Sequence, residues 1–216
     1  MQAMQAFRPI AAAIALLALA GCADPERSRD TADPHVPALA LAQQVCSNCH
    51  GVTGVSTSPN FPNLAAQAPD YLVAQLKAFQ SHHRADPAGF EYMWGLSRSL
   101  TDEQMRGLAA YYAAQAPAAG HAAVRGDLQR GASIYSAGLP DHGVPACAGC
   151  HGAQAQGQGA FPRLAGQHAD YIEKQLQVFQ RTDQRPEGAM MKPVAHALRR
   201  EDMRDVAAYL QSVPAQ

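Results

Sequence analysis

The sequence predicts an all-α protein built as a tandem duplication of one small domain. Residues 61–80 and 161–180 are identical at eleven of twenty aligned positions. No segment shows the alternation of apolar and polar residues that a half-buried strand would require. Within both aligned segments, apolar residues recur every three or four positions, as on one buried helix face; they are Leu72, Leu76, Phe79, Ile172, Leu176 and Phe179.

The duplication divides the chain of 216 residues into five expected segments. They are a signal peptide of the lipoprotein type (1–21), a disordered tether (22–37), a first domain (38–117), a linker (118–125) and a second domain (126–216). Each domain has only about 80–90 residues, which is small for a self-sufficient hydrophobic core. A large apolar group held inside each domain would supply the missing interior.

The first residues have the pattern of an export signal. Arg8 is the only charge ahead of an apolar run at 10–20, which is too short for a permanent membrane span but suits a signal peptide. Leu19-Ala20-Gly21-Cys22 resembles a bacterial lipobox, so we expect Cys22 to be lipidated and to hold the protein at a membrane surface. The alternative is an ordinary signal, cleaved nearby, with Cys22 left as a stray thiol.

Three helices are expected in each domain, in the same order. Pro69 suits the first position of a helix, and Thr101-x-x-Gln104 has the pattern of a capping box. Arg199, at the corresponding start in the second domain, offers no Ser or Thr cap. The expected ranges are Ala38–Val45, Pro69–His82 and Thr101 to just before Pro117 in the first domain, and Gly126–Ser136, Ala169–Arg181 and Arg199–Val213 in the second.

Each domain carries one Cys-x-x-Cys-His motif near its start. This is the attachment pattern of a c-type haem: the two thiols form thioethers with the haem vinyl groups, and the adjacent imidazole binds the iron. The motifs consist of Cys46, Cys49 and His50 in the first domain and Cys147, Cys150 and His151 in the second. We therefore predict two covalently bound haem c groups, with His50 and His151 as iron ligands.

Two other uses of Cys-x-x-Cys fit this chain less well. Structural zinc takes four nitrogen or sulfur ligands in a tetrahedron, and a histidine directly after the second cysteine is poorly placed to join both thiols on one metal ion. A thioredoxin-like redox pair needs a βαβ setting, and no strand-rich segment surrounds either motif. The fifth cysteine, Cys22, lies in the export signal, so none remains for a disulfide.

A methionine is expected as the second axial ligand of each iron. Met93 and Met191 each lie seven residues before a leucine at the start of the last helix, in segments broken by Gly95 and Pro193. We expect those segments to be irregular, so that a side chain there can point over a haem face. A thioether opposite an imidazole stabilises ferrous iron and raises the reduction potential.

Three other methionines compete for this role. Met105 and Met203 also repeat between the domains, but each shares a helix face with apolar residues, and core packing explains them. Met190 competes with Met191, but its counterpart in the first domain is Tyr92, which is a poor ligand for this purpose. Met93 and Met191 remain the predicted ligands.

The motif histidines also need their second ring nitrogen held. Pro62 follows His50 by twelve residues, and Pro162 follows His151 by eleven. Both prolines lie in a Phe-Pro-x-Leu segment that resembles the one in small c-type cytochromes whose proline carbonyl accepts this hydrogen bond and orients the ring. The alternative is a loop proline that only ends a turn. Arg163, beside Pro162, could pair with a haem propionate or face solvent.

The charge balance excludes some partners. The chain has 17 basic and 18 acidic residues, for a formal net charge of −1. No basic patch suggests nucleic acid, and no motif suggests a small-molecule substrate. Apart from the export signal, no apolar run is long enough to cross a membrane.

The paired motifs, two Phe-Pro-x-Leu-Ala-x-Gln segments, two Tyr-x-x-x-Gln-Leu helices and two late methionines resemble the dihaem cytochrome c4 family over nearly all of residues 38–213. The resemblance implies two class I cytochrome c domains facing each other through a pseudo-twofold axis, with His/Met iron in each. It implies periplasmic electron transfer, from a quinol–cytochrome c reductase of the bc type or a dehydrogenase to a haem–copper oxidase. The chain departs from the family in its lipobox, which suggests a tethered form, and in Tyr92-Met93-Trp94, which replaces the methionine-rich run.

Three functions are then open. The first is an electron carrier without catalysis of its own. The second is a dihaem enzyme, such as a peroxidase or a thiosulfate-oxidising cytochrome, which would need an open iron with polar groups above it. The third is a dedicated cytochrome subunit of a dehydrogenase complex. A methionine for each iron favours the carrier over the enzyme.

Overall fold

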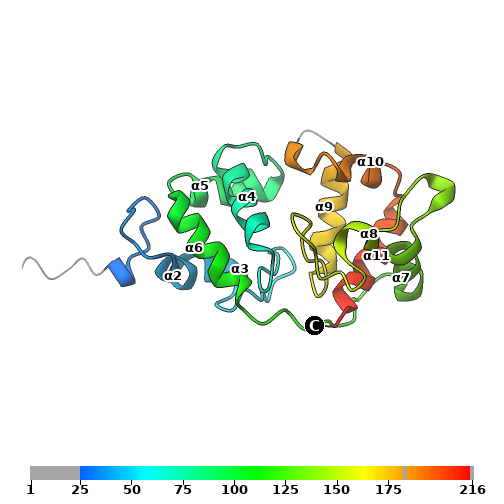
Figure 1. The fold of residues 1–216 in the computed structure, drawn as a ribbon, viewed down its shortest axis with the longest axis horizontal. Coiled ribbons are helices and arrows are strands. Elements are labelled where there is room, and N and C mark those ends of the chain that lie inside the picture. Colours follow the sequence, from blue (N-terminus) through cyan, green and yellow to red (C-terminus); the bar gives the residue numbers. More distant parts are fainter. Residues whose placement is uncertain (1–24, 182–183, 215–216) are drawn as a thin grey trace, which may run out of the picture.

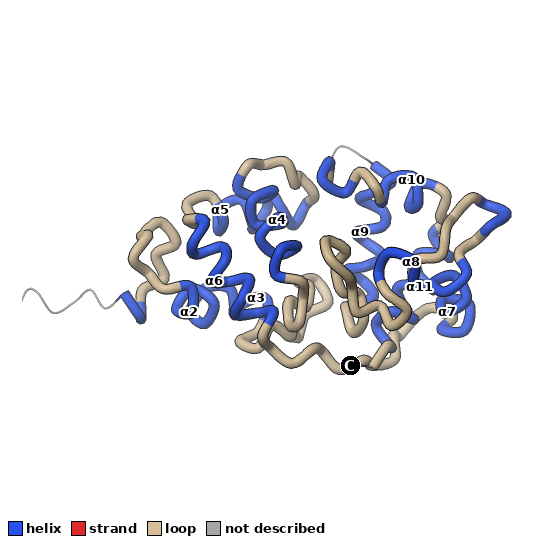
Figure 2. Tube along the Cα trace, viewed as in Figure 1, coloured by secondary structure: helices blue, strands red, loops and turns tan. Residues whose placement is uncertain are grey.

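A computed structural model describes residues 25–181 and 184–214. It shows two helical domains side by side, with the linker running along one edge between them (Figure 1). In the described residues no β-strand forms, and the β-pairing consists of two isolated bridges, Leu139–Val144 and Gln158–Phe161 (Figure 2). The predicted all-α tandem duplication is confirmed.

The first domain begins with one nearly continuous helical stretch that ends in the motif. Its elements are η1 (Pro25–Arg27), α2 (Ala38–Leu41), η2 (Ala42–Cys46), α3 (Ser47–His50), α4 (Pro69–Gln80), η3 (Gly89–Met93), α5 (Trp94–Ser97) and α6 (Asp102–Ala113). The helix expected at 38–45 therefore runs on to His50, through a π-helical turn at η2. No glycine or proline interrupts it before Gly51, whose φ of 75° ends it.

The second domain repeats this order with an added loop between its first helix and the motif. Its elements are α7 (Leu128–Ala137), η4 (Pro140–His142), α8 (Ala148–His151), α9 (Ala169–Arg181), η5 (Pro186–Gly188), α10 (Met191–His196) and α11 (Arg200–Ser212). Helix α7 begins two residues later than expected because the Asp127 side chain accepts from the N–H groups of Gln129 and Arg130 at 2.9 and 3.0 Å. Helix α11 begins where the Arg199 N–H donates to the Asp202 carboxylate at 2.8 Å.

Helix α6 has the predicted capping box. Its glutamine, Gln104, also binds part of the segment expected to be a disordered tether. The Thr101 hydroxyl accepts from Gln104 N–H at 3.1 Å, and Thr101 N–H donates to Gln104 Oε1 at 3.0 Å. The Gln104 amide nitrogen then donates to the carbonyls of Asp33 and Val36. Val36 is only 1% exposed and packs in the first core. The expectation of disorder as far as residue 37 is therefore wrong for the residues next to α2.

The two segments that carry the predicted methionine ligands are helical, which corrects the expectation that they are irregular. Met93 is the last residue of the π-helical turn η3, and Met191 is the first residue of α10. Gly95 is accommodated inside the short helix α5. Pro193 lies in the first turn of α10, where its missing N–H removes no intrahelical hydrogen bond.

Each domain has its own hydrophobic core, formed where the last helix packs on the helices before it. The first core includes Leu41, Met105 and Leu108; the second includes Ile134, Met203 and Val206. Neither Met105 nor Met203 has any exposed surface. The packing role predicted for this methionine pair is confirmed.

The domains face each other through a reciprocal set of hydrogen bonds near the motif prolines. Asn63 N–H donates to Gln167 Oε1 at 2.8 Å, and the Gln167 amide donates back to the Asn63 carbonyl at 2.9 Å. Arg163 N–H donates to Gln67 Oε1 at 2.8 Å, and the Gln67 amide donates back to the Arg163 carbonyl at 3.0 Å. Positions 63 and 163, and 67 and 167, correspond in the repeat, so the interface has the pseudo-twofold symmetry that the resemblance implied.

Candidate haem sites

The motif of each domain occupies one helical turn. Cys46 and His50 are four residues apart along η2 and α3, and Cys147 and His151 have the same spacing at α8, so each pair shares a helix face. Glycine follows each histidine with positive φ. At Gly51 a Cβ would lie 2.2 Å from the Val55 carbonyl oxygen, so no larger residue fits where the chain turns away from the motif.

Each motif histidine is held by the carbonyl of the proline that the spacing indicated. His50 Nδ1 lies 2.9 Å from Pro62 O, and His151 Nδ1 lies 3.0 Å from Pro162 O. Because a carbonyl can only accept, Nδ1 carries the hydrogen in each ring. Nε2 is then the unprotonated nitrogen with a lone pair available to a metal.

The surroundings of both imidazoles favour the neutral form. Burial lowers the pKa of His50 and His151, and the hydrogen bonds to Pro62 and Pro162 offset only part of that effect. A neutral ring is the form that ligates iron.

Aromatic rings pack at the edges of the motif histidines. The Phe61 ring lies 6.2 Å from the His50 ring, edge to face, and 5.9 Å from the ring of Tyr92, the residue before Met93. Phe161 lies 6.0 Å from His151 in the same way. In the first domain this chain of contacts connects the motif to the segment that carries Met93.

The four motif cysteines form no disulfide with one another, and their environments differ. Cys46 and Cys147 are half-buried against the two cores, and burial raises the pKa of each thiol to about 11. Cys49 is also half-buried, whereas Cys150 is exposed. In the second motif, one cysteine is therefore more buried than the other.

The predicted methionines are distinguished by burial. Met191 is half-buried and packs against the second core, as Cys147 does. Met190 is 70% exposed, so its thioether lies largely in solvent. Met93 is half-buried, and its carbonyl accepts from the Ser97 hydroxyl at 2.6 Å. Burial thus favours Met191 over Met190.

The donor set of each domain fits a covalently attached haem. It offers two unpaired thiols, one imidazole with a free Nε2 and one half-buried thioether. A zinc site would instead need several ligands converging on one point, and within residues 25–181 and 184–214 no three His, Cys, Asp or Glu side chains are so placed. A buried, unpaired guanidinium nitrogen, Arg163 Nε, also lies beside the second motif's proline and suits a group that carries carboxylates.

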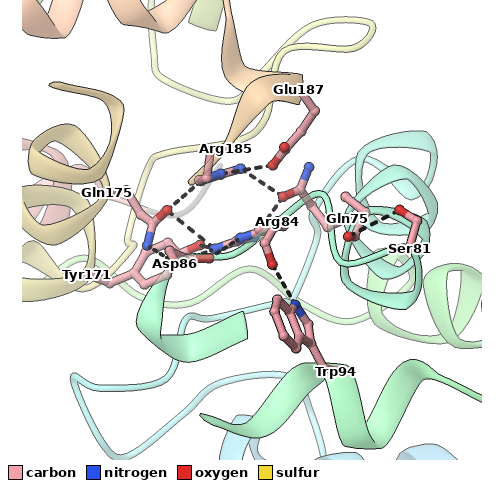
Figure 3. Close-up of polar contacts among 10 residues, drawn as sticks. Gln75, Ser81, Arg84, Asp86, Trp94, Tyr171, Gln175, Arg185 and Glu187 are labelled. Atoms are coloured by element: carbon pink, nitrogen blue, oxygen red, sulfur yellow. Dashed lines mark hydrogen bonds and ion pairs between the residues drawn. The ribbon is translucent and has the colours of Figure 1, made fainter. Parts of the chain in front are cut away.

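The sequence did not predict the polar cluster that links the two domains (Figure 3). Arg84 donates to the side-chain oxygens of Gln75 and Gln175 at 2.7 and 3.3 Å, and Arg185 donates to the same two oxygens at 2.7 and 2.5 Å. The glutamines repeat in the sequence, and Arg-x-Asp at 84–86 matches Arg-x-Glu at 185–187. This repeated Arg-x-acid pattern is the sequence signal from which the cluster could have been predicted.

Acidic side chains balance the two arginines. Asp86 has no exposed surface; it accepts from Arg84 at 3.0 and 3.4 Å and from Gln175 at 3.1 Å. Burial alone would raise the pKa of Asp86, but Arg84 and these hydrogen bonds lower it below its usual range. Arg185 pairs with Glu187 at 3.0 Å. The cluster joins α4 to α9 and keeps the two domains in one orientation.

Cys22 and the export signal lie outside the described residues. The linker belongs structurally to the second domain: Ala118 is buried, and His121 N–H donates to the Gln211 carbonyl at 3.0 Å. None of the helices in the described part of the chain is long and apolar enough to cross a membrane.

Comparison with known proteins identifies the family. The cytochrome c family model matches residues 38–114 and again 128–214. Cytochrome c4 of Thiocapsa roseopersicina is 41% identical over 180 residues, which cover 81% of this chain and 90% of that protein. The solved cytochrome c4 of Acidithiobacillus ferrooxidans superposes with a TM-score of 0.72 at 39% identity, covering 77% of this chain and 97% of that one.

A further relative carries a more specific name. The thiosulfate dehydrogenase electron acceptor of Thiomonas intermedia is 34% identical over 143 residues, 62% of this chain and 62% of that protein. The two matches to one domain model, the cytochrome c4 relatives and the repeated donor sets agree. The chain belongs to the cytochrome c family, as a dihaem electron carrier of the cytochrome c4 type with two covalently bound haem c groups.

Proposed function

We propose that this protein is a periplasmic, membrane-tethered carrier of single electrons. Cys46, Cys49, Cys147 and Cys150 attach the haems; His50 and His151 bind the irons on one side, and Met93 and Met191 on the other. The observation that carries this proposal is the twofold occurrence of one arrangement: a motif histidine whose Nδ1 is held by a proline carbonyl and whose Nε2 is left free.

The haem, when bound, supplies the one-electron chemistry, and the chain's residues set its conditions. Pro62 and Pro162 fix the tautomer and plane of the imidazoles, which makes the nitrogen facing the iron a better donor. The Met93 and Met191 thioethers would favour the ferrous state and would leave no iron position open to peroxide or oxygen. Histidine and methionine ligands held by the fold would limit the rearrangement that accompanies each electron.

The methionine assignment is testable by substitution. Met93→Ala and Met191→Ala should each make one haem high-spin or water-ligated, abolish that haem's ferric sulfur-to-iron absorption and lower its potential. Met190→Ala is the matched control, because Met190 is 70% exposed, and its spectrum should equal the wild type. Loss of the absorption in Met190→Ala instead would show that Met190, and not Met191, is the ligand.

We propose a quinol–cytochrome c reductase or a dehydrogenase as electron donor and a haem–copper oxidase as acceptor. Reduced protein should be reoxidised by membranes that contain such an oxidase, and oxidase inhibitors should stop this. The relative named as a thiosulfate dehydrogenase electron acceptor supports a second candidate, a dedicated acceptor for one such dehydrogenase. Thiosulfate-dependent reduction in the presence of that enzyme, at a rate exceeding reduction by the bc-type complex, would favour this second role.

The location rests on the first residues of the chain. The apolar run and the Leu-Ala-Gly-Cys22 segment support export and lipidation, and c-type haem is attached outside the bacterial cytoplasm. Mass spectrometry of the mature N-terminus should find acylated Cys22. An unmodified N-terminus at another residue would leave the carrier soluble in the periplasm.

A further inference from the structure

Arg163 is a buried cation without a partner. Its side chain is 8% exposed, its Nε is fully buried with no hydrogen bond, and none of the ion pairs or side-chain hydrogen bonds found in the described residues involves its guanidinium. Burial lowers the pKa of Arg163. Leaving a charged donor buried and unpaired is strongly unfavourable, so this position is built for a partner that the polypeptide itself does not provide.

The position of Arg163 indicates where that partner lies. The residue directly follows Pro162, whose carbonyl orients His151. Its backbone is fixed from the other domain, since Gln67 accepts from its N–H at 2.8 Å and donates to its carbonyl at 3.0 Å. The guanidinium therefore starts from a rigid point between the second motif and the domain boundary.

The chemistry of the guanidinium selects a carboxylate. Its planar fork of N–H donors matches the two oxygens of a carboxylate, and such pairs form short, charge-assisted hydrogen bonds. A haem carries two propionate carboxylates. The haem attached beside this residue therefore offers the anion that Arg163 lacks.

The corresponding residue of the first domain is uncharged and already satisfied. Asn63 Oδ1 accepts from Ser56 N–H at 2.8 Å, and its amide nitrogen donates to the Gly166 carbonyl at 2.9 Å. The repeat is therefore broken at position 163, where a cation follows the proline that orients the second motif's histidine. The two haem environments differ in charge even though their axial ligands correspond.

We propose that Arg163 binds a propionate of the haem attached at Cys147 and Cys150, with Gln67 of the first domain holding the arginine in place. The inference rests on the haem attachment proposed above. Pairing cancels one negative charge near the iron, which favours the ferrous state. The pairing therefore raises the reduction potential of the second haem. This effect depends on the first domain, because Gln67 holds the backbone of Arg163.

The test compares Arg163→Gln with the wild-type holoprotein by redox titration and by resonance Raman spectroscopy of the propionate bending modes. One of the two redox steps should shift toward the ferric state several-fold, where tenfold is ~59 mV for one electron, and the propionate mode of one haem should change. Arg163→Lys, which keeps the charge but not the fork, should restore most of the potential while leaving the mode altered. Arg181→Gln, which removes an exposed charge from the same domain, should change neither.

The matched glutamines separate positioning from general damage. Gln67→Ala frees the Arg163 backbone and should alter the same propionate mode, whereas Gln167→Ala, which frees Asn63, should not. Unchanged modes and potentials in both Arg163 variants would overturn the proposal. Mass spectrometry reads the underlying assignment independently: fewer than two attached haems in the wild type would overturn the proposed attachment itself. If Arg163→Gln does not fold, Arg163→Lys and Gln67→Ala decide.

Discussion

Replacing the buried carboxylate of the domain interface, Asp86→Asn, should destabilise the holoprotein by about 3–5 kcal/mol. The change removes one charged acceptor with no exposed surface and weakens three hydrogen bonds, two from Arg84 and one from Gln175. Hydrogen bonds to charged groups contribute ~1.5–3 kcal/mol each, and breaking a buried ion pair by removing one partner costs ~3–5 kcal/mol in total. Both guanidiniums would keep the glutamine oxygens, but only Arg185 would keep a carboxylate partner, the partly exposed Glu187.

The exposed ion pair of the same domain supplies the control. Lys77 and Asp102 lie 3.3 Å apart with side chains that are 50% and 61% exposed, so Asp102→Asn should cost at most ~1 kcal/mol. The assay is urea unfolding followed by haem absorbance and by circular dichroism. A destabilisation in Asp86→Asn no larger than that in Asp102→Asn would refute the assignment of the cluster as the joint between the domains.

The pH dependence of stability provides a second test of Asp86→Asn. Because the pKa of Asp86 is lower in the folded protein than in the unfolded chain, its carboxylate contributes stability that is complete above the unfolded value of about 4. That contribution is lost as the pH falls through the folded value. Wild type should therefore lose more stability than Asp86→Asn between neutral pH and about pH 3, and parallel curves would contradict the lowered pKa.

Three further changes have defined outcomes. Thr101→Ala should cost about 1 kcal/mol in urea unfolding, because it removes the N-cap of α6, while Thr57→Ala on the surface should cost little. Gly51→Ala should lower the yield of haem attached to the first domain, since the new Cβ would meet the Val55 carbonyl; full attachment and wild-type stability would show that the turn after His50 can relax. Cys22→Ala should release the holoprotein from membranes with its spectrum intact, and retention on the membrane would mean that something other than lipid holds it.

Local patterns predicted more of this molecule than long-range ones did. The capping box at Thr101, the stripe along α4 and the contacts of the motif histidines with Pro62 and Pro162 depend on residues within about twelve positions of each other. Spacing along the chain is enough to place such groups. The sequence shows a charge at Arg163, but only the structure shows that this side chain is buried.

The interface cluster was missed because its members come together only when two folded domains dock. Arg84 and Gln175 are 91 residues apart, and nothing within either segment shows that they meet. Gly95 and Pro193 predict irregular methionine segments, because glycine and proline both disfavour the interior of a helix. A glycine in a short helix and a proline in a first turn do not interrupt helical hydrogen bonding enough to prevent it.

Carbon monoxide binding to the ferrous protein tests the central claim most directly, because a carrier and an enzyme differ in whether an iron position is open. If His50 and Met93, and His151 and Met191, fill both axial positions, the reduced wild type should bind carbon monoxide slowly and incompletely at both haems. Met191→Ala should then bind it rapidly at one haem. Rapid stoichiometric binding to one haem of the wild type would show an open iron and contradict the electron-carrier account.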